Sequence, residues 1–246
     1  MLYRSNLAAP DLLLHFKHAW LRPMTYAFEH DIISDWGDKS DDDSVFGLYR
    51  RCGFWTHDEA AILHNVAKQV GGRWCDIGAH TGWTAAHIAT AEGVSQVTAI
   101  DPMLDNREFF QRAFSNLSRI ENRCPILLFP ERSAQYFAKR DASRFMGIVI
   151  DGDHGAPNPL NDAKMAAAHL EADGVILFHD FVGGPVQEGV LYLMDIGFKC
   201  RVFYTPHCVA VCWRGSFVPP DHEPEAYCLR QLTDGRMKDF PFERCE

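Results

Sequence analysis

Short apolar stretches alternate with helical patterns through the middle of this 246-residue chain. The expected strands span residues 73–77, 96–101, 125–129, 147–151, 175–178, 199–204 and 208–213. Patterns with the periodicity of amphipathic helices lie between them, at residues 83–89, 108–117, 133–139, 161–172 and 186–194. Repeated strand–helix units build a parallel sheet with helices on both faces, so we expect a doubly wound, Rossmann-like α/β fold.

The last two expected strands are joined differently from the others. Only Thr205, Pro206 and His207 separate them, which is too short for the crossover that two parallel strands need. We therefore expect a hairpin that makes the final strand antiparallel. Ligands of doubly wound sheets bind beyond the carboxyl ends of the strands, so the residues that follow each strand are the candidates for a site.

The first expected strand runs into the sequence Asp-Ile-Gly-Ala-His-Thr-Gly at residues 76–82. Gly78 and Gly82 would expose backbone N–H groups at the start of the next helix, where a polar ligand can approach closely. Asp76 would repel a pyrophosphate but could accept hydrogen bonds from an ammonium group. The turn thus favours S-adenosylmethionine over NAD, although the same residues also occur in ordinary turns.

The second and third expected strands also end in polar residues. Asp101 follows the glycine turn by about 20 residues, the spacing at which an acidic side chain can bind ribose hydroxyls. Ser133 follows the third strand and could lie beside an adenine ring. For both residues the alternative is a helix cap or turn.

The fourth and fifth expected strands end in the most reactive residues. Residues 151–154 read Asp-Gly-Asp-His, and His179-Asp180 follow the next strand. Adjacent strands would bring these carboxylates and imidazoles to one rim of the sheet. Neighbouring carboxylates repel each other unless a proton or cation lies between them, so a divalent metal is a natural occupant. The alternative is that the aspartates cap helices and the histidines are solvated.

Taken in order, these motifs resemble the class I S-adenosylmethionine-dependent methyltransferases. The closer resemblance is to the branch with a D-G-D-H strand end and a later H-D, which is Methyltransferase 24-like and related to metal-dependent small-molecule O-methyltransferases. The match extends over residues 70–213. It implies a seven-stranded sheet whose last strand is antiparallel.

The resemblance assigns cofactor roles to five of these residues. It implies that Asp76, Gly78 and Gly82 line the methionine end of S-adenosylmethionine. Asp101 would then hold the ribose, and Ser133 would approach the adenine.

The resemblance also implies a metal site and a general base. Asp151, which is expected to touch the cofactor as well, and Asp180 would be metal ligands, with His179 where related enzymes place a third ligand that is usually a carboxylate. Imidazole is a poor ligand for magnesium and suits Mn, Fe or Zn better, so either the metal differs or His179 stays outside the coordination sphere. His154 would be the general base, with Asp151 acting in catalysis through the metal. Asp162 is expected to brace its helix.

These parts predict methyl transfer to a small-molecule acceptor, most simply a hydroxyl. Three other functions stay open at this point. They are an NAD-dependent dehydrogenase, for which the G-x-G-x-x-G turn is missing, a metal-dependent hydrolase that uses the Asp and His cluster, and a non-catalytic module that binds S-adenosylmethionine.

Composition narrows the partners. The chain has a formal net charge of -9 and lacks the basic stripe that binds a phosphate backbone, so a small-molecule substrate is favoured over nucleic acid. No apolar stretch approaches a membrane span. The 8 cysteines are scattered, with no C-x-x-C pair and no cluster of zinc spacing. As free thiols they favour a reducing compartment. We therefore expect a soluble, cytoplasmic protein, and homo-oligomer formation stays open.

We expect three parts in the chain. Residues 1–70 would form an N-terminal helical extension, with helices at 12–29 and 58–70, residues 71–214 the methyltransferase core, and residues 215–246 an extended arm. In related methyltransferases N-terminal helices cover the acceptor site or form dimers. The aromatic residues of this extension could therefore contact substrate, but burial in the core is favoured for Phe46, Tyr49, Phe54 and Trp55.

Overall fold

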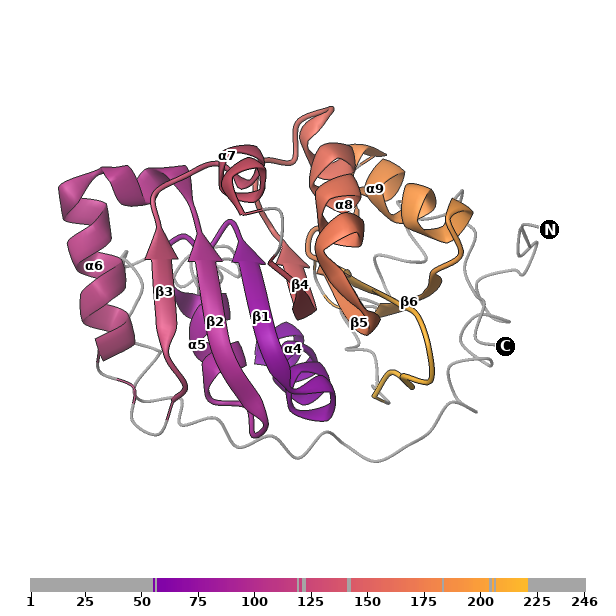
Figure 1. The fold of residues 1–246 in the computed structure, drawn as a ribbon, viewed down its shortest axis with the longest axis horizontal. Coiled ribbons are helices and arrows are strands. Elements are labelled where there is room, and N and C mark those ends of the chain that lie inside the picture. The colour runs from indigo at the N-terminus through magenta and orange to yellow at the C-terminus, as the bar shows by residue number, and fades with distance from the viewer. Residues whose placement is uncertain are drawn as a thin grey trace.

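A computed structural model of the chain describes residues 55–220, except for 56, 119, 121–122, 141–142, 183, 204 and 206. Its centre is one seven-stranded sheet in the order β3-β2-β1-β4-β5-β7-β6 (Figure 1). The strands are β1 Gly72–Ile77, β2 Val94–Ile100, β3 Ile126–Phe129, β4 Phe145–Ile150, β5 Leu170–Phe178, β6 Lys199–Phe203 and β7 Val209–Trp213. The expected doubly wound α/β fold is confirmed.

The order of the strands reverses between β1 and β4. The chain passes outward from β1 to β2 and β3, then returns to place β4 on the other side of β1. All of these neighbours are parallel, so their carboxyl ends share one edge of the sheet. The crevice at such a switch point is where doubly wound folds bind ligands.

The last two strands form the expected hairpin. β7 lies between β5 and β6 and is antiparallel to both. Every residue of β7 is buried, as expected for a strand covered on both faces. The prediction of an antiparallel last strand is therefore confirmed.

Helices cover both faces of the sheet (Figure 1). Helices α4 (His57–Val70) and α5 (Trp83–Ala89) pack with Trp74, Val149 and Leu177 in one hydrophobic core. Helices α7 (Ser133–Lys139), α8 (Asn158–His169) and α9 (Gly184–Asp195) pack with alternate residues of the same strands, among them Ile148 and Ile176, in a second core. The 3₁₀ helix η2 (Pro102–Asp105) and helix α6 (Arg107–Ser118) connect β2 to β3.

One expected boundary is wrong. The helix expected at 161–172 begins at Asn158 and ends at His169, and strand β5 begins at Leu170 rather than at Val175. Leu170 pairs with Phe145 at the start of β4, and a register irregularity follows before Gly147 pairs with Val175. Tertiary pairing therefore overrides the helical propensity of this segment.

Some expectations fall outside the described residues. The helix expected at 12–29, the aromatic residues Phe46, Tyr49 and Phe54, and the arm beyond Pro220 belong to this group. The helix expected at 58–70 is present as α4. None of the helices that the structure describes is both long and apolar enough to cross a membrane.

Candidate active site

The turn after β1 requires glycine at two positions. Gly78 has a φ of 91°, and a Cβ placed there would lie 2.1 Å from the carbonyl oxygen of Asp151 at the end of β4. Gly82 has a φ of 94° at the N-cap of α5, where a Cβ would lie 2.8 Å from Leu117 Cγ. Because only glycine adopts these conformations without strain, the turn can press against β4. The expectation of exposed N–H groups at Gly78 and Gly82 is wrong, because Gly78 N donates to the carbonyl oxygen of Ile100 and Gly82 N to that of Ala79.

Asp76 lies under this turn and is fully buried. Its Oδ2 accepts a hydrogen bond of 2.5 Å from Thr84 Oγ1, whereas Oδ1 has no hydrogen-bond partner among the described residues. Burial raises the pKa of Asp76 to about 7, an effect that Thr84 opposes and that the nearby Asp151 and Asp101 reinforce. A buried carboxylate oxygen without a donor fits the ammonium end of a ligand such as S-adenosylmethionine.

Asp101 joins the end of β2 to the glycine turn. Its Oδ2 accepts from the backbone N–H of His80 and its Oδ1 from that of Met103, each at 2.8 Å. It therefore caps η2, as one interpretation expected. A carboxylate has about four lone-pair sites, so these two bonds orient Asp101 and still leave acceptors for ribose hydroxyls.

Ser133 is the first residue of α7, and Arg132 occupies the N-cap position. The Ser133 hydroxyl donates a hydrogen bond of 2.5 Å to Asp162 Oδ1. Burial raises the pKa of Asp162 to about 6, while the bond from Ser133 lowers it. The pair joins α7 to α8, so Asp162 links two helices and Ser133 stands partly exposed at the start of α7.

Four of the expected side chains meet at the ends of β4 and β5. His179 Nδ1 lies 3.2 Å from both Asp151 Oδ1 and Asp180 Oδ2. His154 lies between the same carboxylates, with Nε2 3.5 Å from Asp151 Oδ1 and Nδ1 3.6 Å from Asp180 Oδ2. We call Asp151, His154, His179 and Asp180 the rim cluster.

Asp180 and Asp153, which the sequence placed at the same rim, are oriented differently. Asp180 has a φ of 52°, in a region that costs a non-glycine residue about 1 to 3 kcal/mol and is enriched at functional sites. Asp153 points away from the rim cluster, where it accepts hydrogen bonds from Gly155 N and Asn158 Nδ2, each at 2.9 Å. Asp153 thus shapes the loop, and two carboxylates rather than three belong to the cluster.

Trp55 completes the rim cluster from outside the core segment. Its indole Nε1–H donates to Asp151 Oδ2 at 2.6 Å, and its ring stacks on His179 with centroids 4.3 Å apart. Burial raises the pKa of Asp151, but His179, His154 and Trp55 outweigh that effect and hold the pKa below its ordinary value. The Trp55 side chain is buried, as the sequence analysis favoured, and it also contacts the candidate site.

Glu59 and His207 lie behind His179, and neither was a candidate from the sequence. Glu59 is fully buried, and its Oε2 lies 3.3 Å from His179 Nε2 and 3.2 Å from His207 Nδ1. Burial raises the pKa of Glu59, but the two histidines outweigh that effect and hold it well below its ordinary value. Glu59 sits in an ordinary helical pattern, so no signal in the sequence distinguished it.

The donor atoms could hold a metal on either side of His179. Asp151, His179 and Asp180 each offer one ligand atom, and these atoms lie within 4.8 Å of one another. Glu59, His179 and His207 meet the same criterion on the buried side. Two carboxylates and one imidazole at the rim fit a divalent cation such as Mn²⁺.

A family model described as a methyltransferase domain matches residues 75–181. The matched segment begins just before Asp76 and ends just after Asp180, so it contains every cofactor, metal and general-base residue that the sequence suggested. Trp55, Glu59 and His207 lie outside it. No curated protein matches the chain.

Solved structures share the fold at low sequence identity. A candidate caffeoyl-CoA O-methyltransferase from Staphylococcus aureus has a TM-score of 0.57 and 15% identity, covering 84% of this chain and 99% of that protein. A candidate O-methyltransferase from Klebsiella pneumoniae has a TM-score of 0.54 and 15% identity, covering 87% and 99%. A precorrin-8w decarboxylase from Methanobacterium thermoautotrophicum has a TM-score of 0.50 and 18% identity, covering 66% and 91%.

The sheet order, the glycine turn over Asp76 and the family match lead to the same assignment. Residues 75–181 form a class I S-adenosylmethionine-dependent methyltransferase domain.

Proposed function

We propose that this methyltransferase transfers a methyl group from S-adenosylmethionine to a hydroxyl of a small-molecule acceptor. One observation carries the proposal: the glycine turn and the rim cluster meet at Asp151. The backbone of Asp151 packs against Gly78, while its side chain contacts His154 and His179. A cofactor held by the turn would therefore lie beside the residues that can activate an acceptor.

Each proposed cofactor residue would bind a different part of S-adenosylmethionine. S-adenosylmethionine supplies the reactive methyl group on a sulfonium, so the protein has to position it. Asp76 Oδ1 would accept from the ammonium group, Asp101 from the ribose hydroxyls, and Ser133 would border the adenine. A pocket of about 300 Å³ lies nearby in the sequence, lined by Met103, Asn106, Glu108, Phe109 and Arg112, but the proposed cofactor residues Asp76, Asp101 and Ser133 do not line it.

His154 is the proposed general base. Its side chain is 43% exposed, the most accessible of the rim cluster, so an acceptor can reach it. The hydrogen-bonding contact with Asp151 raises its pKa, and Asp180 adds to this effect. Both carboxylates thus favour the imidazolium that would form when His154 takes a hydroxyl proton.

Asp151, Asp180 and His179 are the proposed ligands of a divalent metal. A bound cation would supply positive charge that favours the deprotonated hydroxyl of the acceptor and orients it. The three side chains come from the ends of adjacent parallel strands, β4 and β5. Through the bound cation, these ligands would hold the acceptor oxygen in line with the methyl group. Such positioning lowers the activation barrier by several kcal/mol, on a scale of roughly 7 to 11 kcal/mol in ideal cases.

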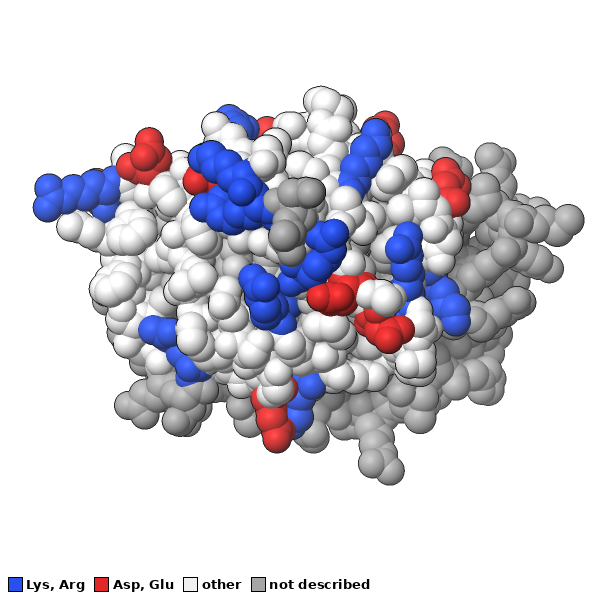
Figure 2. Space-filling view, viewed as in Figure 1, with Lys and Arg blue, Asp and Glu red and all other residues white. Residues whose placement is uncertain are grey.

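The choice of a small hydroxylated acceptor has two supports. Two proteins with the same fold, from Staphylococcus aureus and Klebsiella pneumoniae, are described as O-methyltransferases. On the face drawn in Figure 2, Lys and Arg side chains stand in separate groups with acidic side chains among them. That pattern suits a small substrate better than a phosphate backbone.

The test is formation of S-adenosylhomocysteine by the full-length protein with a panel of phenols, sugars and amines. Methylation of hydroxyl compounds is expected, with the product identified by mass spectrometry. Methylation of amines alone would contradict the O-methyl assignment. Ester hydrolysis that depends on metal but not on S-adenosylmethionine would instead identify a hydrolase.

A further inference from the structure

His179 is held between two groups of carboxylates. Its Nε2 lies 3.3 Å from Glu59 Oε2, and its Nδ1 lies 3.2 Å from Asp151 Oδ1 and from Asp180 Oδ2. The ring is 1% exposed and stacks on Trp55 at an interplanar angle of 12°. Its orientation is therefore fixed at both nitrogens and on one face.

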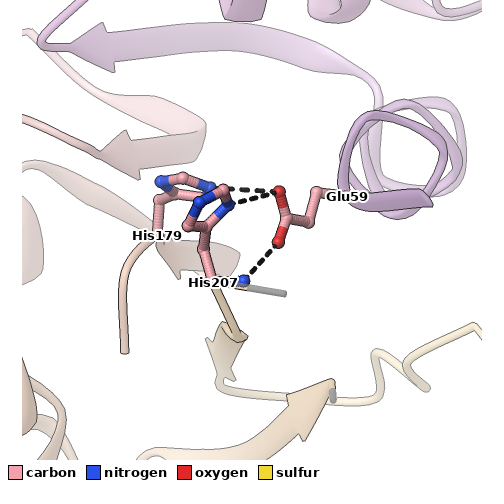
Figure 3. A group of neighbouring side chains, drawn as sticks. All are labelled: Glu59, His179 and His207. Atoms are coloured by element: carbon pink, nitrogen blue, oxygen red, sulfur yellow. Dashed lines mark hydrogen bonds and ion pairs between the residues drawn. The ribbon is translucent and has the colours of Figure 1, made fainter. Parts of the chain in front are cut away.

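Glu59 is itself held in place by His207. The backbone N–H of His207 donates to Glu59 Oε1 at 2.9 Å, and its ring Nδ1 lies 3.2 Å from Oε2. Figure 3 shows the carboxylate of Glu59 on α4 facing both imidazoles, which come from the ends of β5 and of the β6–β7 connection. A fully buried carboxylate with this many partners is built to receive hydrogen bonds from fixed donors.

The two nitrogens of His179 face different carboxylates: Nε2 faces Glu59, and Nδ1 faces Asp151 and Asp180. A carboxylate only accepts hydrogen bonds, so the hydrogen on Nε2 is directed at Glu59. Nδ1 faces two carboxylate oxygens, an arrangement that suits either a proton on Nδ1 or a cation that takes the place of this proton and binds the Nδ1 lone pair and both carboxylates. Metal-binding histidines in proteins commonly donate their second ring N–H to a carboxylate in this way, which fixes the ring and raises its basicity.

We propose that Glu59 is a positioning residue that holds His179 as the nitrogen ligand of a divalent metal shared with Asp151 and Asp180. The inference rests on the metal site of the proposed function and goes beyond it, because it gives Glu59 a role in holding one of the metal ligands. With one imidazole in its ligand set, the site takes Mn²⁺ or Fe²⁺ in preference to Mg²⁺. Helix α4, through Glu59, thereby holds the nitrogen ligand of the site in place from its buried side.

The test is binding of Mn²⁺ to the full-length protein, which is measured as the loss of the electron paramagnetic resonance signal of free Mn²⁺. Glu59→Gln should weaken Mn²⁺ binding by about 10- to 100-fold, the usual effect of losing such a carboxylate. Asp180→Asn should weaken it as well. Glu92→Gln makes the same chemical change on an exposed side chain paired with Lys68 and should bind like the wild type.

A second readout needs no variant. Pulsed electron paramagnetic resonance of Mn²⁺ bound to the wild-type protein should show coupling to an imidazole nitrogen, and Mg²⁺ should compete weakly. Three outcomes would overturn the proposal: no Mn²⁺ binding, no nitrogen coupling, or equal binding by Glu59→Gln and wild type. Loss of the site in Glu59→Gln but not in Asp180→Asn would also overturn it, because the metal would then lie between Glu59 and His207.

This outcome is separable from failure of the proposed function. Calorimetric binding of S-adenosylmethionine and formation of S-adenosylhomocysteine are measured on the same preparations. If S-adenosylmethionine binds and S-adenosylhomocysteine forms, but the Mn²⁺ experiments give one of the overturning outcomes, the metal inference alone is wrong. If neither occurs whatever the metal, the proposed function is wrong.

Discussion

At the scale of single residues, burial decides what each carboxylate of the site can do. Asp76 lies in the core next to the glycine turn, and burial raises its pKa to about 7. Asp151 is also largely buried, yet it has His154, His179 and Trp55 as partners and its pKa is lowered. The first carboxylate therefore suits a ligand that brings its own positive charge, and the second suits a permanent anionic role.

The raised pKa of Asp76 predicts how cofactor binding depends on pH. The ionised form binds the ammonium group, so affinity for S-adenosylmethionine should fall as the pH drops below 7. At pH 6 it should be about tenfold weaker than at pH 8, since only about a tenth of the groups with this pKa are ionised. Calorimetric titration at both pH values checks this. Asp76→Asn should bind weakly with no such pH dependence, and a wild-type affinity that does not change with pH would contradict the role.

The role of His154 predicts a loss of rate without a loss of cofactor. His154→Ala should lower kcat by about 10² to 10⁴-fold, the range for a general base, while the Kd for S-adenosylmethionine stays close to the wild-type value. The control is His64→Ala, because His64 contacts the backbone oxygen of His87 on α5 instead of the rim cluster. A parallel loss of cofactor binding in His154→Ala would show that the residue has a structural role.

At the scale of elements, most of the fold followed from local patterns. Each strand has an apolar run bounded by turn residues, and the three-residue connection before β7 indicated the hairpin. The start of β5 did not follow, because residues 170–172 read as helix and become strand only by pairing with the start of β4. Such pairing joins residues distant in the chain, so a local pattern cannot reveal it.

The contact between the turn after β1 and the end of β4 gives a prediction about stability. Gly78→Ala should lower the free energy of unfolding by about 2 to 4 kcal/mol, from backbone strain and from the clash with Asp151. The matched control is Gly197→Ala, since Gly197 has a φ of 94° and open space around it. It should cost only the strain, about 1 to 2 kcal/mol. Equal losses in urea unfolding would show that the close approach at Gly78 is unimportant.

At the scale of the whole molecule, the site combines what the sequence could indicate with what it could not. The residues at the ends of β1, β2, β4 and β5 were found because strand ends of a parallel sheet converge. Trp55 and Glu59 come from before the first strand and His207 from the connection between β6 and β7, and Glu59 is 120 and 148 residues from the histidines it contacts. Only the folded chain brings them to His179.

The most direct test of one shared active site is a crystal structure of the protein with S-adenosylhomocysteine and Mn²⁺. The ammonium group should lie at Asp76 Oδ1, the ribose at Asp101, and the metal between Asp151 and Asp180 with His179 as its nitrogen ligand. Cofactor bound away from the glycine turn, or with its sulfur far from His154 and Asp151, would contradict the account.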